Sequence, residues 1–193
     1  TNTTGNNLTA IGYNAAYANS GGENTAIGSE ALESNTTGGS NTAVGFRALE
    51  ENTTGDSNTS IGRDALEANT TGSGNVAVGR DVLTTNTTGS HNTGIGQNAL
   101  LTNTTGAYNI SVGKNSLDAN TTGGTNTAIG YESLSGNTTG SSNTAVGSYS
   151  LYSATTASNN TGIGNGALQS TLTGHSNTAV GKSALVLNTT GAN

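Results

Sequence analysis

The chain has 193 residues, a formal net charge of −6, 30 glycines, 4% aromatic residues and 8% charged residues. Only five residues are basic, which argues against a nucleic-acid or anionic-membrane partner, and no apolar run is long enough to cross a membrane. There is no Cys and no Pro, so no disulfide framework holds the fold and no backbone N–H is lost from a hydrogen-bonded ladder.

The chain is a tandem repeat of 17 residues. A block of the form Asn-Thr-Ala-Ile/Val-Gly returns ten times at this spacing, after a degenerate copy at residues 8–12. The ten blocks begin at Asn24, Asn41, Asn58, Asn75, Asn92, Asn109, Asn126, Asn143, Asn160 and Asn177. Repeats this short are typical of solenoids, because one coil cannot bury a hydrophobic face until its neighbours stack on it. We expect residues 1–193 to form a single continuous array, an internal piece of a longer fibre chain.

The first coils are less regular than the rest. Gly12 and Gly28 are 16 residues apart, so one residue is missing between Asn19 and Asn24, which predicts a shortened corner. A second block, Asn-Thr-Thr-Gly, recurs in the same phase. Its copies begin at Asn2, Asn35, Asn52, Asn69, Asn86, Asn103, Asn120, Asn137 and Asn188, with altered versions at Asn19, Ala154 and Thr171.

Two apolar columns are predicted to form the core. In the typical copy at residues 41–57, the position of Val44 is always Ile or Val, and the position of Leu49 is Leu in every copy except Ala16. Side chains that stay apolar at a fixed spacing are expected to point inward. The predicted core is Ile27, Val44, Ile61, Val78, Ile95, Val112, Ile129, Val146, Ile163 and Val180, with Leu32, Leu49, Leu66, Leu83, Leu100, Leu117, Leu134, Leu151, Leu168 and Leu185.

The residues around Val44 indicate a short strand. Thr42 precedes it by two and is replaced by Val76 and Ile110 in other coils, so period two places Thr42 and Val44 together on the inward face. Ala43 then faces the other way. The variable pairs after each Gly and after Leu are typical of corners. The sequence therefore predicts an all-β fold, a parallel β-solenoid of about eleven coils and roughly 50 Å in length.

From Ile27 to Val180 the Ile/Val column alternates strictly between Ile and Val. Duplication of a two-coil unit explains this pattern, and so does staggered packing of layers that differ by one methylene. The core of a lone coil is thin, because burying one Leu and one Ile or Val returns far less than the entropy cost of ordering 17 residues. We therefore expect a homo-oligomer, preferably a trimer, or a lateral filament. The expected contact is the small column Ala26, Ala43, Ser60, Ala77, Gly94 and Ser111.

The sequence offers few residues that could carry out catalysis. His91 and His175 lie five coils apart, too far to cooperate. Glu33, Glu50 and Glu67 share a column on three successive coils, where either exposure to water or an intervening cation would relieve their repulsion. No column is acidic in every copy, as calcium-binding repeats require. We expect no enzyme activity, no cofactor and no metal site.

The Asn-Thr-Thr blocks allow two interpretations. They match the N-glycosylation acceptor pattern, and they also suit a ladder in which each Asn amide bonds to the same amide one coil away. The residues concerned are Asn35, Asn52, Asn69, Asn86, Asn103, Asn120 and Asn137. Regular Thr columns also suggest an ice-binding face, although adjacent residues such as Thr53 and Thr54 point to opposite sides and leave one outward Thr per coil.

The phrase Asn-Thr-Ala-Ile/Val-Gly-x-x-Ala/Ser-Leu resembles the head repeats of trimeric autotransporter adhesins. The full 17-residue phrase is similar to arrays in bacterial and phage tail-fibre-domain proteins. This resemblance implies a left-handed parallel β-roll that trimerises, in an extracellular, cell-surface or virion location. The predicted function is the shaft of a fibre, with any host receptor or surface glycan bound by domains outside this sequence. The alternative is a ligand-binding solenoid whose Thr and Asn ladders form an ice-binding or glycan-binding face.

Overall fold

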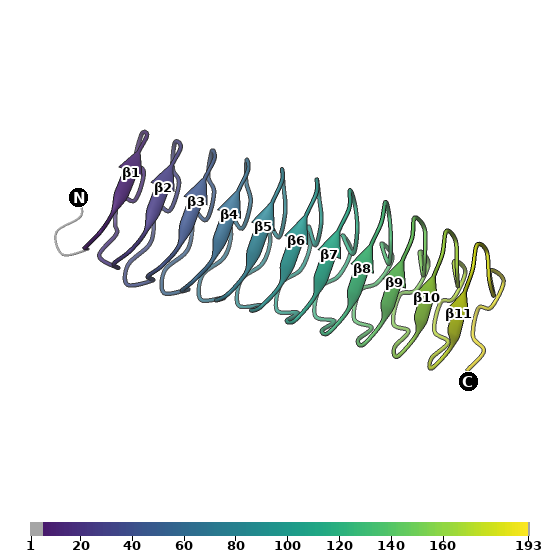
Figure 1. Ribbon diagram of the computed structural model, residues 1–193. Coiled ribbons are helices and arrows are strands. Elements are labelled where there is room, and N and C mark those ends of the chain that lie inside the picture. Colours follow the sequence, from purple (N-terminus) through teal and green to yellow (C-terminus); the bar gives the residue numbers. More distant parts are fainter. Residues whose placement is uncertain (1–5, 193) are drawn as a thin grey trace.

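A computed structural model describes residues 6–192 and shows a β-solenoid rod with the two ends of the chain at opposite ends (Figure 1). The copy of Asn-Thr-Thr-Gly at Asn2 lies outside the described residues. Eleven strands form one parallel sheet in chain order. They are β1 (Thr9–Ile11), β2 (Thr25–Ile27), β3 (Thr42–Val44), β4 (Thr59–Ile61), β5 (Val76–Val78), β6 (Thr93–Ile95), β7 (Ile110–Val112), β8 (Thr127–Ile129), β9 (Thr144–Val146), β10 (Thr161–Ile163) and β11 (Thr178–Val180).

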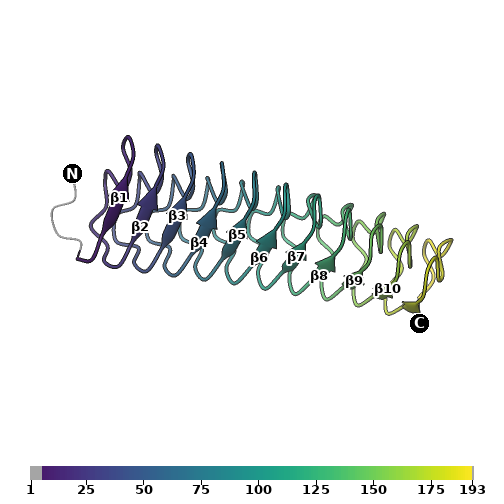
Figure 2. The same ribbon diagram turned by 45° about the horizontal axis from the view of Figure 1, so that its top comes forward.

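The coils stack in strict register. Each strand pairs with the equivalent residues of the next coil, so that Thr42 is opposite Thr59 and Val44 is opposite Ile61. The shortened first interval is absorbed at the corner, since Thr9 still pairs with Thr25. Figure 2 shows the strands following one another along a single side of the rod. The predicted all-β parallel solenoid is confirmed, and residues 6–192 contain no helix long and apolar enough to span a membrane.

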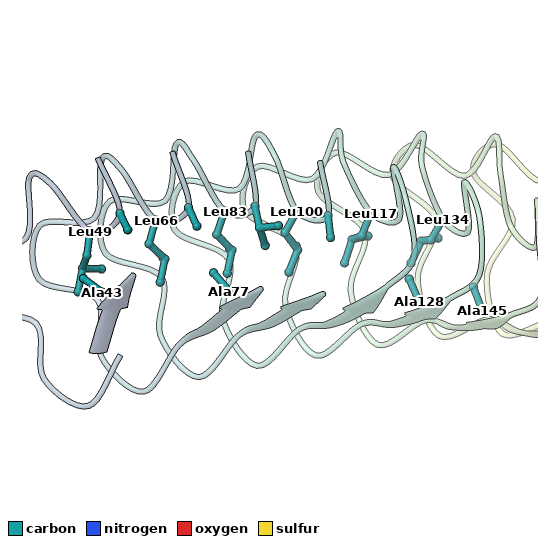
Figure 3. Close-up of a cluster of buried hydrophobic side chains, with 14 of the residues drawn as sticks. Ala43, Leu49, Leu66, Ala77, Leu83, Leu100, Leu117, Ala128, Leu134 and Ala145 are labelled. Atoms are coloured by element: carbon teal, nitrogen blue, oxygen red, sulfur yellow. The ribbon is translucent and has the colours of Figure 1, made fainter. Parts of the chain in front are cut away.

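The structure reverses the predicted phase of the strand. Ala43 in β3 is fully buried and points toward Leu49 across the interior (Figure 3), whereas Thr42 and Val44 face outward and are partly exposed. The Ile/Val side chains assigned to the core at Ile27, Val44, Ile61, Val78, Ile95, Val112, Ile129, Val146, Ile163 and Val180 therefore lie on the outer surface. The small column assigned to the contact between copies, Ala26, Ala43, Ser60, Ala77, Gly94 and Ser111, is buried inside the coils.

The physical reason is the narrow interior of the coil. The Leu side chains fill it as a row, and only Ala, Ser or Gly fits between them and the strand (Figure 3). Nine of these Leu residues are fully buried, namely Leu32, Leu49, Leu66, Leu83, Leu100, Leu117, Leu134, Leu151 and Leu168. Leu185, in the last coil, is 52% exposed. Buried hydroxyls are satisfied across the coil, as where Ser60 Oγ donates to the carbonyl of Ala65 at 2.6 Å.

One large residue in the interior is matched by a glycine. Val82 stands where the other coils have Ala or Ser, and it faces Gly94, at which an added Cβ would lie 2.6 Å from Val82 Cγ1. We expect Gly94→Ala to destabilise the array by about 1 to 3 kcal/mol through overpacking. In the Val82→Ala background the same change should cost much less, because it restores the Ala–Ala pair of other coils. Urea unfolding of the four proteins in the cycle measures this coupling, and equal costs in both backgrounds would contradict it.

Each regular coil also contains left-handed residues that are not glycine. In the coil of β3 these are Arg47, Leu49 and Ser57, with φ of 51°, 56° and 58°. Such conformations cost of order 1 kcal/mol or more for bulky residues. The buried Leu accepts this cost because the left-handed turn aims its side chain into the core.

The two glycine columns, the second of which is interrupted by Ala157, serve close approach between coils. Gly62 has φ of 136°, and a Cβ there would collide with the carbonyl group of Gly79 in the next coil. Gly72 has no left-handed backbone, yet a Cβ would collide with Asn69 Oδ1 and with the carbonyl of Gly89. At Gly62 and Gly72 the corner therefore has no room for a side chain, whatever the φ of the residue.

Candidate interaction face

The outward side chains of the sheet form two straight columns, which we call the strand face. One column holds Ile or Val, and the other holds Thr except at Val76 and Ile110. Between β2 and β10 the Ile side chains at Ile27, Ile61, Ile95, Ile129 and Ile163 are 36–40% exposed, and Ile110 is 43% exposed. The Val side chains Val44, Val78, Val112 and Val146 are partly buried. The strand face is thus a continuous strip of apolar and hydroxyl-bearing side chains.

Backbone hydrogen bonds hold this strip rigid on both of its edges. Before the strand, the amide of Thr42 donates to the carbonyl of Asn58 in the next coil at 2.8 Å. After it, the amide of Gly62 donates to the carbonyl of Val44 in the preceding coil, also at 2.8 Å. The same bonds recur from coil to coil, so the spacing between neighbouring side chains is set by the ladder, about 4.8 Å.

None of the sixteen charged residues of the chain belongs to the strand face. The charges lie at corners, where the best-formed cluster surrounds Arg47. Its guanidinium pairs with Asp64 at 2.9 Å, with Glu67 at 2.5 Å and with Glu50 at 3.9 Å. Partial burial raises the pKa of Glu50 and of Glu67 above its usual value, and Arg47 opposes that shift.

Two members of the column of Glu33, Glu50 and Glu67 therefore pair with Arg47, namely Glu50 and Glu67. Carboxylate oxygens of Glu30, Glu33 and Glu50 come within 4.8 Å of one another, and Glu33 also accepts a hydrogen bond from Asn14 Nδ2 at 3.0 Å. Arg47 compensates the charge of Glu50 and Glu67, so that part of the corner is an ion-pair cluster.

The Asn residues of Asn-Thr-Thr-Gly form a buried ladder, which we call the turn ladder. Asn52 Nδ2 donates to Asn35 Oδ1 at 2.7 Å and to the carbonyl of Gly55 at 3.0 Å, so both of its protons are used. The same pair of bonds recurs at Asn69, Asn86, Asn103, Asn120 and Asn137. All of these side chains are fully buried. In the folded coil the amides are thus structural, and the glycosylation interpretation does not fit them.

A second ladder, the strand ladder, was not predicted from the sequence. It consists of the Asn residue that precedes each of the strands β2 to β11. Asn41 Oδ1 accepts from the backbone amide of Asn58 at 2.9 Å and from its Nδ2 at 3.2 Å, and that Nδ2 also donates to the carbonyl of Gly72 at 2.9 Å. The available signal was that this position is Asn in all ten regular copies.

The turn ladder is interrupted near the C-terminal end. Asn137 Oδ1 is buried with no hydrogen-bond partner, because Ala154 replaces the next Asn and offers no donor. In the same coil Ala157 replaces Gly. The two changes belong together, since a Cβ at the equivalent Gly55 would lie 2.5 Å from Asn52 Oδ1.

The Thr residues of Asn-Thr-Thr-Gly do not form a flat face. Thr53 Oγ1 donates to the carbonyl of Thr70 at 2.9 Å, so its hydroxyl is committed to the next coil, and Thr54 is exposed at the corner. The regular outward Thr array is instead that of the strand face. The two histidines stay apart, and His91 stacks on Tyr108 with ring centroids 5.1 Å apart.

A further aromatic group lies at corners of the eighth and ninth coils. The ring of Tyr149 makes edge contacts with Tyr131 and Tyr152, at centroid distances of 5.4 and 5.8 Å. A hydrogen bond to Glu132 and the negative charge of that carboxylate raise the pKa of Tyr131 to about 12.

No family model, curated protein or solved structure matches the chain.

Proposed function

We propose that the chain is the shaft of an extracellular or virion fibre and that its copies associate through the strand face. The observation that carries this proposal is the uncharged strip of Thr, Ile and Val along the whole rod. An exposed apolar patch of this length on a soluble protein is typical of an interaction surface. The strand face thus takes the place of the contact expected from the sequence, because the small column lies inside the coils.

Charge supports self-association through this face and not through the others. Two copies that each carry a net charge of −6 repel wherever their acidic corners approach. The strand face bears no charge, so identical copies can meet there without burying an ion. The resemblance to trimeric adhesin heads favours three copies around a common axis, with the strand faces inward.

Stiffness is the mechanical property that suits the chain to a shaft. The backbone ladder runs without a proline from β1 to β11, and the turn and strand ladders add buried amide bonds between coils. Each coil is thereby tied to its neighbours at the strand, and also at the turn wherever the turn ladder is continuous. A rod built this way can hold a tip domain away from a surface without bending at a weak joint.

The test places two carboxylates on the strand face. Ile95→Asp together with Ile129→Asp should leave the circular dichroism spectrum unchanged and convert the oligomer to monomer in light scattering, because both side chains already lie at the surface. The matched control is Thr105→Asp with Thr139→Asp, which adds the same charge at exposed corners of the same rod. An oligomer that survives the first pair, or dissociates equally with the control, would count against the strand face.

Ice binding is the second candidate function, and a specific observation favours it. The outward Thr and Ile/Val columns form a straight and repetitive array held by the backbone ladder, which the corner Thr residues do not. On this proposal a monomeric array should shape ice crystals and show thermal hysteresis. Thr93→Tyr with Thr127→Tyr should abolish both effects, whereas Thr105→Tyr with Thr139→Tyr should not. No hysteresis in the monomeric parent would eliminate this candidate.

A further inference from the structure

A repetitive face poses a problem of axial register, and this inference rests on the proposed association through the strand face. If every coil presented the same side chains, two copies could slide past each other by one coil and lose only the contacts at their ends. Register in sheets is set by side-chain pattern, and it is weakly specified where that pattern is uniform. A shaft with uniform coils would thus assemble with frayed ends.

The strand face is not uniform, because it is corrugated with a period of two coils. The coils of β2, β4, β6, β8 and β10 carry Ile, whose side chains are 36–40% exposed. The coils of β3, β5, β7 and β9 carry Val, which is one methylene smaller and partly buried. Within the Ile/Val column the protruding side chains are therefore about 9.6 Å apart along the rod, twice the strand spacing.

The two exceptions in the Thr column follow the same division. Val76 and Ile110 replace Thr, and both lie on Val coils, beside Val78 and Val112. These two coils are separated by one Ile coil. The added apolar bulk therefore distinguishes Val coils from Ile coils a second time, in the neighbouring column.

We propose that the alternation fixes the parity of the axial stagger between associating copies. A register that matches coil types correctly at one contact matches them at every contact, whether the preferred match is Ile against Val or like against like. A slip by one coil reverses all of these matches at once, whereas a slip by two coils preserves them. Small packing differences of one methylene thus add along the rod, because close-packed interfaces respond to single methylenes.

Cysteine cross-linking can measure this parity, because the chain has no Cys of its own. Three single variants place the probe on the strand face: Thr93→Cys and Thr127→Cys on Ile coils, and Thr144→Cys on a Val coil. Equimolar mixtures of tagged and untagged proteins are assembled and treated with a short bis-maleimide. Products between coils of the same type are then compared with products between coils of different types. The comparison holds for parallel and for antiparallel copies, since both preserve parity.

One of the two classes of product is expected to exceed the other by at least about tenfold, which corresponds to roughly 1.4 kcal/mol. The matched control removes both differences between the coils. It changes Ile27, Ile61, Ile95, Ile129 and Ile163 to Val and restores Thr at Val76 and Ile110, and none of these side chains lies in the core. In that background the two classes should form in nearly equal amounts. Equal amounts in the parent, or an unchanged ratio in the control, would overturn the parity proposal while leaving association through the face intact. If light scattering shows a monomer and no product forms, both proposals fail.

Discussion

Replacing Leu100 by Ala is expected to lower the free energy of unfolding by about 3 to 4 kcal/mol. Leu100 is fully buried in the row of Leu side chains, and the stacked coils above and below are held at fixed spacing by their ladders. The interior therefore cannot collapse into the space that the isobutyl group leaves. Urea denaturation followed by circular dichroism measures the change, at a protein concentration where the array is monomeric.

Ile95→Ala is the matched control for that measurement. It removes a side chain of the same volume five residues earlier in the same coil, but from the strand face, where Ile95 is 40% exposed. We expect a loss of about 1 kcal/mol or less in the monomer. If both changes cost the same, the assignment of Leu to the interior and Ile to the surface is wrong.

Completing the turn ladder is expected to stabilise the array by about 2 kcal/mol. The variant combines Ala154→Asn, Ala157→Gly and Thr171→Asn. Asn at 154 would donate to the unpartnered Oδ1 of Asn137, and Asn at 171 would donate to the new amide in turn. The carbonyl of Gly174 is already in place to accept the second hydrogen bond from the Asn side chain at 171. The ladder would then continue unbroken toward Asn188.

The order of these substitutions provides the internal control. Ala154→Asn alone should destabilise the protein, because the Cβ of Ala157 occupies the space that the amide oxygen needs, as the contact at Gly55 shows. Adding Ala157→Gly should reverse the sign of the effect. Hydrogen exchange at the backbone amides of 154–157 locates the change, and an Ala154→Asn protein that is already more stable than the parent would refute the explanation.

The sequence predicts the coil and its register but not which side of the strand is inside. Period two places Thr42 and Val44 on one face and Ala43 on the other, and this division is correct. Apolar character suggests that Val44 is inside, whereas the interior has room only for Ala43 because Leu49 already fills it. The signal that decides between them is volume: the inner position changes only among Ala, Ser and Gly along the chain.

Left-handed backbone at non-glycine residues was also missed, and one column does carry a sign of it. The position of Arg47 is Asn, Asp or Gly in many coils, and these residue types tolerate positive φ. From the sequence alone, however, the variability of this position indicates only that it is exposed to solvent. The position of Leu49 carries no such sign. There, burial of the side chain outweighs backbone preference, and a sequence of Leu residues cannot reveal that.

The Asn ladders give the rod a direction. Each amide donates to the coil before it and accepts from the coil after it, as Asn52 does between Asn35 and Asn69. The carboxamide dipoles therefore point the same way along the rod, and aligned hydrogen bonds polarise one another. A coil added on the C-terminal side meets carboxamide acceptors that are already fixed in position, while one added on the N-terminal side meets carboxamide donors. The two ends of the array are consequently different templates, so growth of the folded structure along the chain is not symmetric.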